Sequence, residues 1–132
     1  MFDQLLAAIN SSDVAYLRHV AHDQLPRVRN AEWPDLYYLY LVCQQLNDSG
    51  GCDLIMNQIP PRGDCGIQML TLRDAGYMEL LRAIQLTTAG DRRQAVDTLK
   101  FVQFLGELSG DPELRKLAQS KIVQDSCRTA RF

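Results

Sequence analysis

The sequence predicts an all-α protein of six to seven helices stacked as antiparallel hairpins. Apolar residues recur at three- and four-residue spacing, and clusters of Gly, Pro, Asn and Ser separate these segments. No stretch alternates apolar and polar residues as a half-buried strand does. A chain of 132 residues is long enough to bury one hydrophobic core. We therefore predict a single domain over residues 1–124 and a C-terminal tail over residues 125–132.

The first two predicted helices form a short hairpin. Apolar side chains recur at helical spacing over residues 2–9, and Asn10 begins the break that follows. Ser12 or Asp13 is suited to cap the second helix, because its side chain accepts hydrogen bonds from the unpaired N–H groups of the first turn. Pro26 is expected to end that helix, since proline has no N–H to donate.

The third predicted helix begins at Trp33-Pro34, with proline suited to the first turn, and continues over residues 35–47. Its first turns are apolar nearly all round, as expected of a helix covered on two sides. The cluster at residues 47–51 is expected to stop it. Residues 52–70 are the least regular segment, with one short helix predicted over residues 53–58.

The second half of the chain predicts three helices. Thr71 begins a capping box, and a long helix is predicted from there to about Ala89. Gly90 suits the left-handed closing position of that helix, and Asp91 suits the cap of the next. A closing glycine followed by a capping aspartate recurs at Gly110 and Asp111, and here Pro112 follows in the first helical turn. The last helix is predicted to end at about Gln124.

The segment 83–102 resembles a tetratricopeptide hairpin, in which small and aromatic residues of two helices meet beside a Gly-Asp-type turn. The matching residues are Ala83, Leu86, Gly90, Asp91, Ala95 and Leu99. Glu79 and Arg82 stand where that family has large apolar residues, and its period of about 34 residues does not recur here. The resemblance implies a tetratricopeptide-like right-handed array of hairpins.

A second resemblance covers residues 33–43, where Trp33-Pro34-Asp35-Leu36 leads into Leu39, Leu41 and Cys43. This segment resembles the aromatic-Pro-Asp-Leu helix of small helical chaperones in bacterial type III secretion. Those proteins cover an aggregation-prone helix of a partner before export. The resemblance implies a chaperone-like role.

Composition and charge narrow the classes of function. Hydrophobic residues make up 46% of the chain and charged residues 23%, which excludes wholesale disorder. The formal net charge of −2 argues against nucleic-acid binding. No run approaches the roughly 18 apolar residues of a membrane span, and the N-terminus lacks the basic start of a signal peptide. We expect a cytoplasmic protein with no membrane insertion.

The cysteines and histidines give a weak case for chemistry. Cys52 and Cys65 lie in similar loops and are candidates for a redox pair or a metal clip, although no Cys-x-x-Cys spacing occurs. His19 and His22 share one helical face, which the sequence places on the polar side. Cys43 falls on an apolar face and is expected to pack in the core. We predict neither an enzyme, nor a cofactor, nor a metal site.

The aromatic residues give the strongest indication of function. Trp33, Tyr37, Tyr38 and Tyr40 lie within eight residues, and Phe101 and Phe104 lie on a second face of a later helix. Because three tyrosines on different faces of one helix do not all point into one core, we expect at least one to face a partner. The predicted partner-binding residues are Trp33, Tyr37, Tyr38, Leu41, Phe101 and Phe104.

These observations predict a non-catalytic protein-binding module, an adaptor or chaperone-like protein that holds a partner's helix or extended segment in a helical groove. Two alternatives stay open: a small inhibitor that blocks a larger enzyme, and a Cys/His metal or redox protein. A hetero-oligomer and a homodimer are both compatible with the pattern.

One variant tests this groove. If Tyr38 faces a partner, Tyr38→Asp weakens partner binding and leaves helicity and melting temperature nearly unchanged, as circular dichroism would measure. If the substitution instead unfolds the protein, Tyr38 belongs to the core.

Overall fold

Helices make up every element of the computed structural model, which describes residues 2–61 and 71–129. No strand occurs within those two ranges, so the all-α prediction is confirmed. The chain forms two compact units, residues 1–60 and residues 61–132. That the two belong to one domain over residues 1–124 stays a prediction.

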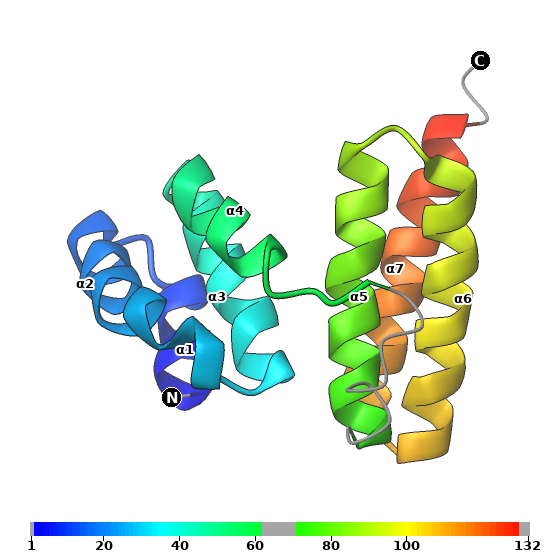
Figure 1. The fold of residues 1–132 in the computed structure, drawn as a ribbon, viewed down its shortest axis with the longest axis horizontal. Helices are drawn as coiled ribbons and strands as arrows, with labels where there is room; N and C mark the ends of the chain where they lie inside the picture. Colours follow the sequence, from blue (N-terminus) through cyan, green and yellow to red (C-terminus); the bar gives the residue numbers. More distant parts are fainter. Residues whose placement is uncertain (1, 62–70, 130–132) are drawn as a thin grey trace. The chain divides into compact units, whose positions relative to one another are not determined.

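The first unit is built around α3 (Figure 1). Its described elements are α1 (Phe2–Asn10), α2 (Val14–Gln24), the 3-10 helix η1 (Leu25–Asn30), α3 (Trp33–Gln45) and α4 (Ser49–Met56). Helices α1, α2 and α4 all pack against α3. Because α3 has three neighbours, nearly every side of its first turns is covered.

Local capping explains where the helices of the first unit begin. The Asp13 carboxylate accepts hydrogen bonds from the N–H groups of Ala15 and Tyr16, at 3.0 and 3.3 Å, as the sequence predicts. Helix α2 ends at Gln24, and the chain continues through Pro26 as the 3-10 helix.

Helix α4 begins earlier than predicted. It starts at Ser49 rather than at residue 53, and its first turn contains the two glycines that were expected to form a break. The Asp48 side chain accepts a hydrogen bond of 3.0 Å from the Gly51 N–H. This cap satisfies an otherwise unpaired N–H group, and it supports a helical turn with two poor helix formers in it.

The described part of the second unit, residues 71–129, consists of long helices that run side by side in alternating directions (Figure 1). They are α5 (Leu72–Thr88), α6 (Arg92–Ser109) and α7 (Pro112–Thr129). Helix α6 packs against both α5 and α7, whereas α5 and α7 contact each other little. Helix α7 continues to Thr129, so the predicted end at Gln124 is too early.

The predicted turns of the second unit are confirmed. Gly90 and Gly110 have φ angles of +89° and +69°, a left-handed backbone that favours glycine. Asp91 then caps α6 by accepting from the Gln94 N–H, and Asp111 accepts from the Leu114 N–H at the start of α7. Thr71 caps α5 by accepting from the Asp74 N–H at 3.1 Å.

Asp111 also ties the start of α5 to the turn between α6 and α7. Its carboxylate lies 3.0 Å from the Arg73 Nε, and the Arg73 guanidinium lies 5.5 Å from the centre of the Tyr77 ring. The pair fixes the end of the bundle where α5 begins.

Two glycines allow close helix packing in the second unit. A Cβ atom on Gly106 would lie 2.9 Å from the backbone nitrogen of Arg115, so α6 and α7 approach each other closely there. A Cβ atom on Gly76 would collide with a methyl group of Leu114, which is the far end of a flexible side chain. A side chain rotates more easily than a helix backbone moves.

We therefore expect Gly106→Ala to destabilise the second unit more than Gly76→Ala. Each substitution raises the helix propensity of its position and so stabilises the helix by about 1 kcal/mol. At Gly106 the added methyl group also forces two helix backbones apart, which costs about 1–3 kcal/mol. Urea unfolding of the two variants and of the wild type measures the difference. Equal free energies of unfolding for the two variants would show that α7 moves freely against α6.

Candidate functional site

Three large apolar side chains lie exposed along one line of α6. Phe101 is 49% exposed, Phe104 52% and Leu108 55%. Their spacing of three and four residues places them on one side of the helix. We call these three residues the α6 stripe. Leu105, which directly follows Phe104, is buried in the bundle.

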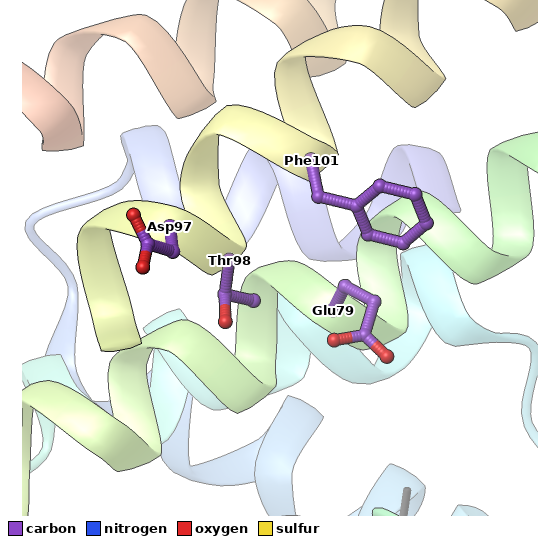
Figure 2. Close-up of a pocket in the computed structure, with 4 residues that line it drawn as sticks. All are labelled: Glu79, Asp97, Thr98 and Phe101. Atoms are coloured by element: carbon purple, nitrogen blue, oxygen red, sulfur yellow. The ribbon is translucent and has the colours of Figure 1, made fainter. Parts of the chain in front are cut away.

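A hollow of about 240 Å³ adjoins the stripe at Phe101. Glu79 of α5 lines it together with Asp97, Thr98 and Phe101 of α6 (Figure 2). Figure 2 shows the Phe101 ring extending beside Glu79, with Thr98 between Glu79 and Asp97. The hollow therefore joins an aromatic ring to two carboxylates.

The charge of the hollow comes from Asp97. Glu79 and Arg82 are only 7% and 8% exposed, and the Arg82 Nε lies 3.0 Å from the Glu79 Oε2. Pairing offsets the cost of burying both charges and leaves their sum neutral. Asp97 is exposed on α6 and lies one turn before Phe101 on the same side of the helix. The residues that line the hollow thus have a net negative charge, and the exposed cations Arg93 and Lys100 of α6 are not among them.

The predicted residues of α3 do not form an exposed surface. Tyr37 is 2% exposed and Tyr38 4%, and their rings contact edge to face with centres 5.1 Å apart. Tyr40 is buried too, and burial, more than its neighbours, raises the pKa of its hydroxyl. The expectation that one tyrosine faces outward is therefore wrong, because α1, α2 and α4 pack against α3 and all three tyrosines are buried.

The other predicted partner-binding residues divide between the two units. Trp33 and Leu41 of α3 are half-buried, while Phe101 and Phe104 of α6 are half exposed or more. Of these residues, only Phe101 and Phe104 belong to the candidate site. Sequence reasoning missed Glu79, Asp97 and Thr98; the one signal was the charged pair at positions 79 and 82, where the tetratricopeptide pattern has apolar residues.

The cysteines of the first unit are poor nucleophiles. Cys43 is fully buried, as predicted, and burial raises the pKa of its thiol to about 12, with smaller contributions from Cys52 and Asp48. Burial also raises the pKa of the half-buried Cys52 thiol. The thiolate, not the thiol, attacks or binds metal, so both groups are held in the unreactive form at neutral pH.

The histidines and the other possible metal ligands do not form a site within the described part of the chain. His19 and His22 are both exposed on α2. Among the side chains that the structure describes, no three His, Cys, Asp or Glu gather to hold a metal ion. Cys52 lies in α4 rather than in a loop, and its candidate partner Cys65 lies outside the described residues.

Comparison with family models, with curated proteins and with solved structures finds no match for this chain. Within the described ranges, no helix combines the length and the apolar character that a membrane crossing requires.

The burial of Tyr38 reverses the expected effect of Tyr38→Asp. Placing a carboxylate in this covered position is expected to lower the free energy of unfolding by about 3 kcal/mol or more. Thermal denaturation followed by circular dichroism measures the change, and Tyr38→Phe, which keeps the ring, is the control. An unchanged melting temperature for the aspartate variant would place Tyr38 at an accessible surface.

Cys43 is expected to resist alkylation in the native protein. Treatment with iodoacetamide at neutral pH should label Cys43 only after unfolding in guanidinium, as peptide mass spectrometry of both samples would measure.

The raised pKa of the Cys43 thiol also makes the stability of the protein depend on pH. The native state holds this proton more tightly than the unfolded chain, so stability falls as pH rises from about 9 toward about 12. Rapid native labelling would contradict both statements.

Proposed function

We propose that this protein is a non-catalytic protein-binding module that holds a helix of a partner protein against the α6 stripe. The observation that supports the proposal is the exposure of three large apolar side chains along one helical line. Apolar surface of this kind gains free energy when a partner removes it from water, by roughly 25 cal/mol for each Å² buried. An amphipathic helix presents a matching line of side chains at the same spacing.

The adaptor or chaperone-like form of this function rests on the resemblance of residues 33–43 to type III secretion chaperones. The tetratricopeptide-like pairing of α5 with α6 is part of the same proposal. Burial of Ala83, Ala95 and Leu99 supports it, because these small and apolar residues occupy the positions where the helices of that family meet. A cytoplasmic location is part of the same proposal, and the net charge of −2 favours protein over nucleic acid as the partner.

Phe104→Glu is expected to weaken partner binding strongly without unfolding the protein. Phe104 is more than half exposed, so the charge stays in water when the protein is alone, but it enters an apolar contact when a partner binds. Loss of a central aromatic contact of this kind costs about tenfold or more in affinity. Val123→Glu, which alters an equally exposed apolar residue of α7, is the matched control.

The measurement combines cross-linking with capture. A photoreactive phenylalanine at position 101 should cross-link a partner in an extract of the native source, and mass spectrometry would identify it. The same partner must co-purify with wild type and with Val123→Glu, and must be lost with Phe104→Glu. A partner retained equally by all three proteins would show that the α6 stripe is not the binding surface.

A further inference from the structure

The carboxylate of Asp97 lies next to the α6 stripe and indicates which charge a partner helix carries there. Asp97, Phe101, Phe104 and Leu108 follow one another at spacings of four, three and four residues. They therefore form one line that is acidic at its first position and apolar at the next three. A helix lying along this line places one residue next to Asp97 and the hollow, and apolar residues next to the α6 stripe.

The hollow suits a cation with a flat face. Asp97 supplies the net negative charge, and the half-exposed Phe101 ring supplies a face on which a cation is attracted. The neutral pair of Glu79 and Arg82 adds polar atoms without cancelling the charge of Asp97. An arginine side chain meets both requirements, since its guanidinium is planar, permanently charged and able to stack on an aromatic ring.

A second copy of this chain that pairs α6 with α6 along the α6 stripe does not bring a cation to Asp97. In a parallel pair of α6 helices, Asp97 would face its own counterpart. In an antiparallel pair centred on Phe104, Asp97 would lie past the end of the second copy's α6 at Ser109, level with the turn that contains Asp111. Asp111 already pairs with Arg73 and caps α7. It is an acid like Asp97 and therefore cannot form an ion pair with it. Charge complementarity therefore favours a different protein.

We propose that the α6 stripe and its hollow bind an amphipathic partner helix in which an arginine, one turn from a line of apolar residues, enters the hollow between Asp97 and Phe101. This inference rests on the proposed function and specifies its partner. The apolar residues of the partner cover Phe104 and Leu108, and the arginine sets the position of the helix along α6.

The test is a selection that does not assume the partner's identity. A phage-displayed library of single helices, randomised along one face, is selected on the full-length protein and counter-selected on Phe104→Glu. We expect the enriched helices to carry apolar residues at three- and four-residue spacing and an arginine one turn beyond them.

The most enriched peptide and its Arg→Gln counterpart are then measured by fluorescence anisotropy. Loss of the arginine, or Asp97→Asn in the protein, should each weaken binding roughly fivefold, and the two changes together should weaken it no further. Glu113→Gln, which removes another exposed acid of the same unit, should leave affinity unchanged. Circular dichroism checks that Asp97→Asn retains its helices.

Three outcomes would overturn the inference, and they are distinguishable. If the enriched helices require Phe104 but carry no arginine beside Asp97, the proposed function is supported and the inference about the arginine is wrong. If no enriched helix depends on Phe104, both the proposed function and the inference about the arginine are wrong. A dimer of the free protein in sedimentation experiments that Phe104→Glu abolishes would make a second copy the occupant.

Discussion

Helix α6 packs one side against two neighbours, and the candidate site is a consequence of that constraint. Ala95, Leu99 and Val102 are buried on the side that meets α5 and α7. A helix that meets both neighbours with one side leaves its other side in water, whatever residues it carries there. The close approach of the Arg115 backbone to Gly106 fixes how α7 lies against α6. The exposure of the α6 stripe therefore depends on packing some distance from it.

The buried pair of Glu79 and Arg82 gives the hollow its particular character. An unpaired charge at either position would be costly to bury, and the 3.0 Å contact offsets that cost. A large apolar residue at position 79, as in the tetratricopeptide pattern, would extend the apolar surface next to Phe101. The charged pair instead provides a polar wall without net charge, so the single acid Asp97 determines which charge the hollow attracts.

Much of the fold is predictable from the sequence, because the signals act over a few residues. The caps Thr71, Asp91 and Asp111 accept hydrogen bonds from groups three residues away, and the closing glycines need only their own φ angle. Helix α4 was placed too late because its two glycines resemble a break, and the balance between the Asp48 cap and poor helix propensity is too close to judge from residue types.

The sequence by itself determined that Phe101 and Phe104 share one side of a helix, and that the first turns of α3 are apolar all round. Only the tertiary structure decided that Tyr37 and Tyr38 are covered while Phe101 and Phe104 are not. Helical periodicity specifies the angle of each side chain about its own axis, but it does not specify how many neighbours surround that axis. Helix α3 packs against α1, α2 and α4, whereas α6 packs against α5 and α7 through its buried side. Asp97 joined the site for the same reason, because the hollow is formed only where α5 lies beside α6.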